Sequence, residues 1–414
     1  MSEPADETAD AADPAPHAAG LRVLRLKRGE DRRLRAGHLW VFSNEVDNQA
    51  TPLGGFAVGA IARVHSDRDQ FLGYAYVNPH ALICARILSR SPVHPPDRSL
   101  LLHRLKVALA LRERLYAAPY YRVVFGEADG LPGLVLDRYG NLLVGQIATA
   151  GMEALRAEVE SAIVDVLAPE ALVWKNDGSA RELEQLPRQF ITAIGRAPAE
   201  VSVLEAGSRY TAPLAGGQKT GWFYDQTANR ETFRRLLWPG ARVLDVCSYA
   251  GAWAVSALRA GAREALCVDS SEAALATATG NAAANGVALG TRRGDAFDVL
   301  DELIRQGERF DVVVLDPPAF IKRRKDVARG QAAYRKLNQL AMRLLERDGL
   351  LVSCSCSYHL GADELLGLIQ AAGRHSSRFV QLLSTGGQSP DHPMHPAIPE
   401  TRYLKAFFCR VTRE

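Results

Sequence analysis

The second half of the chain alternates between short apolar runs and segments with helical patterning. Mostly apolar runs occupy residues 242–246, 264–269, 310–315 and 350–356. Runs of this kind are typical of strands that are buried on both faces, and regular alternation with helices predicts a doubly wound parallel α/β sheet. We expect this sheet to span residues 216–414 and to be completed by weaker strand patterns at 288–293, 379–384 and 403–411.

Two other regions precede this α/β unit, and 414 residues are too many for a single average core. Residues 21–94 hold short β-like runs between glycine, asparagine and proline, which predicts a small β-rich domain. Residues 97–215 begin with a helical segment at 98–116 and continue with hairpin-like runs at 121–137, which predicts a central α+β domain.

The first 20 residues are rich in alanine, proline and aspartate and hold no lysine or arginine, so we expect a disordered tail at 1–20 rather than a signal peptide. No run of 18 apolar residues occurs, which argues against a membrane span. The six cysteines have no zinc-site spacing. We therefore expect a cytoplasmic protein with reduced thiols and no metal, and the choice between monomer and homodimer stays open.

Polar side chains stand where the predicted strands end. Ligands of doubly wound sheets bind beyond the carboxyl ends of the strands, and an acid after the second strand typically holds a ribose. A dinucleotide would need closely spaced glycines in the first loop, but Cys247 and Tyr249 stand there. S-adenosylmethionine carries no phosphate and needs fewer glycines, so we favour it. The alternative is that the acids at the strand ends only cap helices. The residues concerned are Asp245, Asp269, Asp295, Asp316 and Cys356.

Three of these acids have a predicted task in cofactor binding. Asp245 lies near the expected position of the amino group or ribose, and Asp269 near the ribose diol. Asp295 is expected to accept from the adenine amino group, with Phe297 packed on the ring.

Five motifs together resemble a known family. They are RAGHLWVFS at 35–43, GEADGLPGL at 126–134, KTGWFYDQ at 219–226, DPPAF at 316–320 and SCS at 355–357. The chain resembles the ribosomal RNA large-subunit methyltransferase I family. The resemblance implies a class I, Rossmann-like methyltransferase domain, an RNA-binding PUA domain, and 5-methylcytosine formation in ribosomal RNA, 23S by expectation.

The resemblance also implies site residues. Pro317 and Pro318 stand where many other 5-methylcytosine enzymes carry a second catalytic cysteine, and Cys354 stands where the family has an aromatic or apolar residue. The further cofactor-binding residues that it implies are Lys219, Thr220, Arg230, Ser248, Tyr249, Gly251, Ala296 and Pro317.

A thiol beside an acid suits attack on cytosine. Carbon C5 is a weak nucleophile until a thiolate adds at C6, and the thiolate is the reactive form of cysteine. We expect Cys356 to be the nucleophile and Asp316 to bind the N3/N4 edge of the base as a general acid. Cys354 lies on the same face of a regular strand but one step deeper. The simpler interpretation of either thiol is a small buried apolar residue.

Two basic segments are candidate RNA contacts. One lies just after Phe320, and the other opens the β-rich domain. Basic runs are usually solvated, but the first borders the expected active site, where phosphate contacts are favoured. The candidates are Arg28, Arg32, Arg33, Lys322, Arg323, Arg324 and Lys325.

Two other functions remain open at this point. An Asp-Pro-Pro motif followed by an aromatic residue also suits direct methyl transfer to a purine amino group or ring nitrogen, without a covalent intermediate. The chain could also be an RNA-binding protein that lacks catalysis, in which case it would not bind the methyl donor.

Overall fold

The computed structural model describes residues 20–413, so nearly all of the predicted tail at 1–20 lies outside the described residues. The N-terminal unit is a five-stranded sheet with the order β1-β3-β4-β5-β2 and one short helix, α1 (Arg32–Arg35). Strand β2 is only three residues long, pairs with β5, and was not among the strands predicted from the sequence. The strands are β1 (Val23–Arg25), β2 (Trp40–Phe42), β3 (Ile61–His65), β4 (Phe71–Val77) and β5 (Ile83–Ser89).

A second five-stranded sheet, ordered β10-β9-β8-β7-β6, forms the central unit. Helices α2 (Arg98–Leu115) and α4 (Arg156–Leu167) share a core with this sheet, and the hairpin β11–β12 follows it. A short helix, α3 (Ala150–Ala154), precedes α4 and is divided from it at Leu155. The strands are β6 (Tyr120–Phe125), β7 (Leu134–Tyr139), β8 (Leu142–Ile147), β9 (Ala171–Asn176), β10 (Gln189–Ile194), β11 (Glu200–Glu205) and β12 (Ser208–Pro213), and a short helix α5 (Ala180–Leu183) lies between β9 and β10.

The last unit is a seven-stranded sheet with the order β15-β14-β13-β16-β17-β19-β18. The fold class is therefore the predicted α/β class, but the sheet is not wholly parallel, because β19 runs antiparallel to both of its neighbours. The strands are β13 (Arg242–Val246), β14 (Glu264–Asp269), β15 (Gly290–Arg293), β16 (Phe310–Leu315), β17 (Leu345–Ser355), β18 (Arg378–Gly387) and β19 (Lys405–Arg413).

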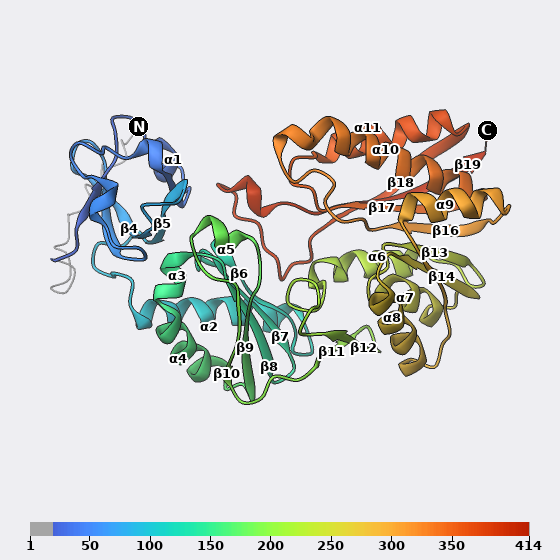
Figure 1. Ribbon diagram of the computed structural model, residues 1–414, viewed down its shortest axis with the longest axis horizontal. Helices are drawn as coiled ribbons and strands as arrows, with labels where there is room; N and C mark the ends of the chain where they lie inside the picture. Colours follow the sequence, from blue (N-terminus) through green and yellow to red (C-terminus); the bar gives the residue numbers. More distant parts are fainter. Residues whose placement is uncertain (1–19, 414) are drawn as a thin grey trace, which may run out of the picture.

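Helices cover both faces of this sheet (Figure 1). One buried cluster joins the sheet to α9, α10 and α11, and the other joins it to α6, α7 and α8. This double cover explains why the central strands are apolar on both faces. The helices are α6 (Thr227–Leu236), α7 (Ala252–Arg259), α8 (Glu272–Ala284), α9 (Ala296–Arg305), α10 (Val327–Leu344) and α11 (Ala362–His375).

The segment between β18 and β19 connects this unit with the other two (Figure 1). Arg112 of α2 donates from Nη2 to the carbonyl of Asp391 at 2.7 Å, and the backbone N–H of Arg122 in β6 donates to Asp391 Oδ2 at 2.9 Å. Further along, Ala397 lies against Gly37 of the N-terminal unit. Among the described residues, no helix is long and apolar enough to cross a membrane.

Candidate active site

A cavity of about 430 Å³ lies at the carboxyl ends of β13, β14, β16 and β17. Both faces of the sheet are covered by helices, so the strand ends are where backbone turns and polar side chains can reach a ligand. It is lined by most of the predicted site residues: Lys219, Arg230, Ser248, Tyr249, Asp269, Asp295, Ala296, Phe297, Asp316, Pro317 and Cys356.

The loop after β13 has the backbone conformation of a glycine-rich turn with little glycine. Cys247 and Tyr249 adopt positive φ values of 63° and 47°. The N–H groups of Cys247 and Ser248 both donate to the carbonyl of Val268, and the N–H of Tyr249 donates to Asp269 Oδ2 at 2.9 Å. Left-handed backbone in residues other than glycine is costly and persists only where neighbouring contacts hold it, typically beside a ligand.

The cofactor side of the cavity is acidic and has a free hydroxyl. Asp269 accepts from two backbone N–H groups, so it organises the loop as well as facing the cavity. Asp295 is exposed and caps α9 by accepting from the N–H of Phe297 at 2.9 Å, which agrees with the capping alternative for this acid. The Oγ of Ser248 is buried without a hydrogen-bond partner among the described residues. Polar atoms are therefore available to a bound ligand here.

Three residues predicted to contact the cofactor do not line this cavity. Asp245 is fully buried under the loop, where Oδ2 accepts from the N–H of Ala254 at 3.1 Å, and burial raises its pKa to about 8. Thr220 is buried and donates its hydroxyl to Asp137 of the central sheet. At Gly251 a Cβ atom would stand 2.7 Å from the Cβ of Ala278, so this glycine allows close helix packing. The sequence placed these three residues near the site, but it could not show whether each one lines the cavity or supports the residues that do.

Arg230 lines the cavity, yet its charge is already compensated. Its guanidinium donates to both carboxylate oxygens of Glu205 at 2.6 Å, and both side chains are buried. Burial alone would raise the pKa of Glu205, but the guanidinium outweighs it and the pKa is lowered. This pair ties α6 to the hairpin β11–β12, so Arg230 has a structural role that the resemblance alone did not indicate.

The two neighbouring cysteines differ in their surroundings. Cys354 is fully buried in the core cluster with Val314 and Val352. Cys356 is partly exposed and lines the cavity. Strand β17 ends at Ser355, so Cys356 leaves the sheet and the expected shared face does not apply to it. The accessible thiol is therefore that of Cys356.

Two carboxyl groups near this thiol have pKa values shifted in opposite directions. Asp316 accepts from Nε2 of Gln226 at 2.9 Å and from Nε1 of Trp253 at 3.1 Å, and burial raises its pKa. For Asp225, burial would also raise the pKa, but the ammonium of Lys219 at 2.8 Å outweighs it and holds the pKa well below the usual range. Neighbouring acids whose pKa values are moved apart in this way suit different tasks in acid–base chemistry.

Other charges act on the thiol itself. Burial, and then the nearby Asp316 carboxylate, raise the pKa of Cys356, whereas Lys219 lowers it. Lys405 of β19 is also buried, donates from Nζ to the carbonyl of Ser357 at 2.6 Å, and has a pKa lowered to about 8 by burial. The thiolate is therefore formed more readily at alkaline pH.

Several residues around Asp316 and Asp225 were not predicted from the sequence to belong to the site. Gln226 and Trp253 hold Asp316, and the hydroxyl of Tyr403 donates to Asp225 Oδ2. Asp225 and Gln226 belong to the KTGWFYDQ motif, so the signal was present, but only the fold shows which atoms they present.

The basic candidates lie on the surface. Lys322, Arg323, Arg324 and Lys325 are all exposed in the segment between β16 and α10, directly after Phe320, which lines the cavity. Arg28 and Arg32 of the N-terminal unit are exposed. Arg33 differs from them, because it pairs with Glu45 at 2.6 Å and lies over the ring of Phe42.

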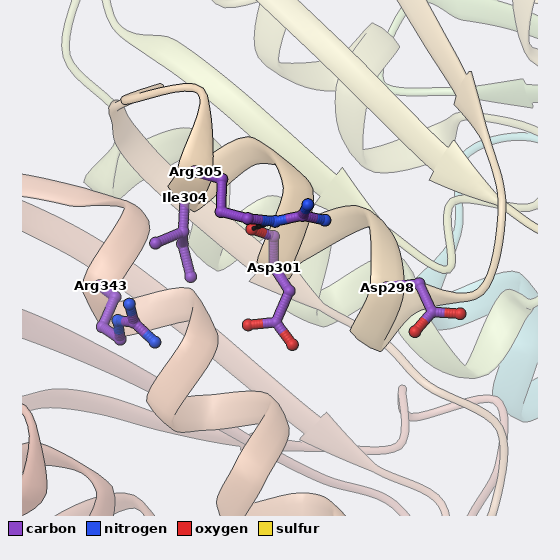
Figure 2. A pocket seen from close by; sticks show the side chains of 5 residues that line it. All are labelled: Asp298, Asp301, Ile304, Arg305 and Arg343. Carbon is purple, nitrogen blue, oxygen red and sulfur yellow. Dashed lines mark hydrogen bonds between the residues drawn. The ribbon is translucent and has the colours of Figure 1, made fainter.

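A second hollow of about 460 Å³ lies between α9 and α10 and holds none of the predicted site residues. Figure 2 shows its lining of Asp298, Asp301, Ile304, Arg305 and Arg343. Among residues 20–413, no cluster of histidine, cysteine and acidic side chains could hold a metal ion.

Comparison with known proteins agrees with this geometry. A PUA-like domain profile matches residues 24–90, and an S-adenosylmethionine-dependent methyltransferase profile matches residues 190–408. The chain is 34% identical over 401 residues to ribosomal RNA large subunit methyltransferase I of Erwinia tasmaniensis, covering 94% of this chain and 99% of that relative. The chain belongs to the ribosomal RNA large-subunit methyltransferase I family. Its relative of the same name in Photobacterium profundum is 32% identical over 396 residues.

Solved structures confirm the fold of this family member. A candidate S-adenosylmethionine-dependent methyltransferase from Streptococcus mutans superposes with a TM-score of 0.79 at 20% identity, covering 94% of this chain and all of the other. A structure described as a methyltransferase complexed with SAH gives a TM-score of 0.80 at 21% identity. The chain is thus a class I, S-adenosylmethionine-dependent methyltransferase with a PUA-like domain.

The cavity fits the cofactor of this family. The methyl donor is a sulfonium cation, and the lining supplies Asp269 and Asp295 together with the unpartnered Oγ of Ser248. Phe297 offers an aromatic surface beside Asp295. The left-handed loop holds Asp269 in place through the N–H of Tyr249 without building a phosphate cradle, as a phosphate-free ligand requires.

Proposed function

We propose that this methyltransferase modifies C5 of a cytosine in large-subunit ribosomal RNA, 23S by expectation, through a covalent bond between Cys356 and C6 of the base. The observation that carries the proposal is the partly exposed thiol of Cys356 in the same cavity as the buried carboxyl of Asp316. A direct transfer to nitrogen would need the acid but no thiol.

Each protein group then has a chemical task. The Cys356 thiolate adds to C6, which makes C5 nucleophilic. Asp316, whose pKa burial raises, supplies a proton or hydrogen bond at N3 as negative charge develops there. The bound cofactor supplies the electrophilic methyl group. Loss of the C5 proton then expels the thiolate and restores the aromatic base.

Cofactor binding is proposed for the lining residues described above. Asp269 would hold the ribose diol and Asp295 the adenine amino group, with Phe297 against the ring. Ala296, Pro317 and the backbone of the loop after β13 would enclose the rest. Asp245, Thr220 and Gly251 would act by supporting the residues that line the cavity.

RNA contact is proposed for the exposed basic groups. The segment 322–325 lies next to the cavity wall, and Arg28 and Arg32 are exposed on the PUA-like domain. Phosphate contacts at both places would anchor structured RNA while one cytosine is turned out of its stack. We also propose domain limits of 21–94, 97–215 and 216–414, because each range holds a sheet of its own.

The test uses RNA that carries 5-fluorocytosine at the target. Fluorine cannot leave as a proton does, so the covalent adduct should accumulate on Cys356 in the presence of S-adenosylmethionine. The matched pair is Cys356→Ala, expected to lose the adduct and methyl transfer, and Cys354→Ala, expected to keep both. Fragmentation of the modified peptide separates the two sulfur atoms. An adduct on Cys354 would overturn the assignment, and active enzyme without any adduct would favour transfer to nitrogen.

A further inference from the structure

One oxygen atom in the catalytic wall has no partner. Asp225 lies in the short 3-10 turn Tyr224–Gln226, is 2% exposed and lines the cavity. Its Oδ2 accepts from Nζ of Lys219 at 2.8 Å and from the hydroxyl of Tyr403. Its Oδ1 is buried without a hydrogen-bond partner among the described residues. An unpaired oxygen of an ionised carboxylate is costly to bury, so it needs a donor from a ligand or from a water molecule.

The position of this oxygen is tied to Asp316. Gln226 follows Asp225 in the chain and donates from Nε2 to Asp316 Oδ1 at 2.9 Å. Trp253 donates to the other oxygen of Asp316 at 3.1 Å. The two carboxyl groups therefore belong to one wall, but only Asp225 has an acceptor with no donor attached.

The charge state of Asp225 suits an acceptor. Lys219, His392 and Tyr403 face it, and together they outweigh the effect of burial, so its pKa is held well below the usual range. Asp316 lies nearby and has its own pKa raised by burial and, further, by Asp225. The cavity lining thus presents one ionised acceptor, Asp225, beside Asp316, a carboxyl group whose pKa is raised.

We propose that Asp225 Oδ1 accepts a hydrogen bond from the exocyclic 4-amino group of the target base and thereby selects cytosine over uracil. The inference rests on the proposed function and deepens it. Cytosine presents an N–H donor at this place, which is the group that a carboxylate recognises. Uracil presents a carbonyl oxygen instead, which would leave Asp225 unpaired and place two acceptors against each other. Asp316 is then left for N3, the neighbouring atom of the same edge.

The decisive variant is Asp225→Asn, read with two probes. Lys219 and Tyr403 are both donors, so they hold the amide oxygen and turn the amide N–H₂ toward the cavity. This group suits the O4 carbonyl of uracil. We expect RNA with 5-fluorocytosine to label Cys356 of the unchanged protein much faster than RNA with 5-fluorouracil. In Asp225→Asn the ratio of the two labelling rates should fall by about 100-fold or more.

A control variant separates recognition from stability. Asp391 is also buried, and both of its oxygens are engaged, by the N–H of Arg122 and by His392, outside the cavity lining. Asp391→Asn should weaken folding but leave the ratio of labelling rates unchanged. Binding of S-adenosylmethionine confirms that each variant is folded.

The possible outcomes distinguish failure of this inference from failure of the proposed function. An unchanged ratio in folded Asp225→Asn would overturn the inference while the proposed function stands. If Asp225→Asn does not fold, equal labelling of the unchanged protein by both probes would still overturn it. If the unchanged protein forms no adduct with 5-fluorocytosine although it methylates RNA, the proposed covalent function fails, and the inference fails with it.

Discussion

The central sheet and the catalytic cavity both bury charged side chains, but they treat them differently. In the central unit, Arg122 donates to both oxygens of Asp137 at 2.7 and 2.8 Å, and Arg112 donates to both oxygens of Asp129 at 2.6 and 2.8 Å. In the cavity lining, Asp225 and Ser248 each keep a buried oxygen without a partner among the described residues.

A bidentate pair of this kind supports the fold, whereas an unpaired oxygen in the cavity lining is available to a ligand. Unpaired buried atoms also occur in the central unit, at Asn176 Nδ2 and Arg181 Nη2, but these residues do not line the cavity. Burial is similar in both regions, so burial alone does not mark a functional residue. Removing one member of a buried pair leaves an uncompensated charge, whereas the cost of an unpaired group near a cavity is already offset by the rest of the fold. Substitutions in the central sheet should therefore mainly lower the free energy of unfolding, whereas substitutions around the cavity should mainly change ligand binding. The larger effect is expected in the central sheet.

Breaking a pair in the central sheet should have the strongest consequence. Arg122→Met leaves Asp137 buried without its main partner and should lower the free energy of unfolding by about 3–5 kcal/mol. Urea denaturation followed by fluorescence measures this change. The double variant Arg122→Met, Asp137→Leu should recover most of the loss, because no charge then remains buried. A loss below about 1 kcal/mol for the single variant would contradict a structural role for the pair.

A smaller effect is expected for a carboxylate that faces the cofactor. Asp269→Ala should weaken S-adenosylmethionine binding by about 1.5–3 kcal/mol in calorimetry, as for other charge-assisted hydrogen bonds. The matched control is Asp245→Asn, because Asp245 is buried behind the loop and burial raises its pKa to about 8, so a neutral amide resembles its neutral form. The control should bind within about twofold of the unchanged protein. Equal losses in both variants would refute the distinction between lining and support.

The pH dependence of Cys356 reactivity tests the electrostatic coupling between this thiol and Asp316. Burial and the Asp316 carboxylate raise the pKa of Cys356, so the thiolate fraction is small at neutral pH and grows about tenfold per pH unit below that pKa. Iodoacetamide labelling of Cys356, followed by peptide mapping, should rise with pH in this way. Asp316→Asn removes a nearby negative charge and should move the profile to lower pH. A profile that stays in place would show that the two groups are not electrostatically coupled.

Strands with mostly apolar runs could be predicted closely from the sequence. The bounds of β13, β14 and β16 match the expected runs, because strands buried on both faces have no alternation to confuse them. Strand β19 could not be assigned its antiparallel direction, since direction depends on the path of the segment after β18.

The site was predictable at the level of strand ends, but not of individual atoms. Cys356 and Asp316 lie in the cavity as expected, whereas Asp245 lies behind it. The role of Asp225 depends on Tyr403, 178 positions later in the chain. Such long-range pairing has no local sequence signal, so the unpaired oxygen is evident only once the fold is known.

The weakest consequence is expected at the surface of the PUA-like domain. Arg28 and Arg32 are exposed and make no ion pair with described residues, whereas Arg33 is held by Glu45 and Phe42. Replacing Arg28 and Arg32 with alanine should leave unfolding unchanged and make RNA binding less sensitive to salt. The slope should fall by about one unit for every phosphate that the protein no longer neutralises. The measurement is an RNA titration over a series of salt concentrations.

Arg33→Ala is the matched control for that titration. Its guanidinium already neutralises Glu45, which is 6% exposed, so its removal should destabilise the domain and leave the salt slope nearly intact. If Arg33→Ala flattens the slope as much as the loss of Arg28 and Arg32, then a paired arginine also contacts phosphate. Pairing within the fold would then not distinguish structural from functional charges on this surface, and the comparison between the central sheet and the cavity would hold only for buried groups.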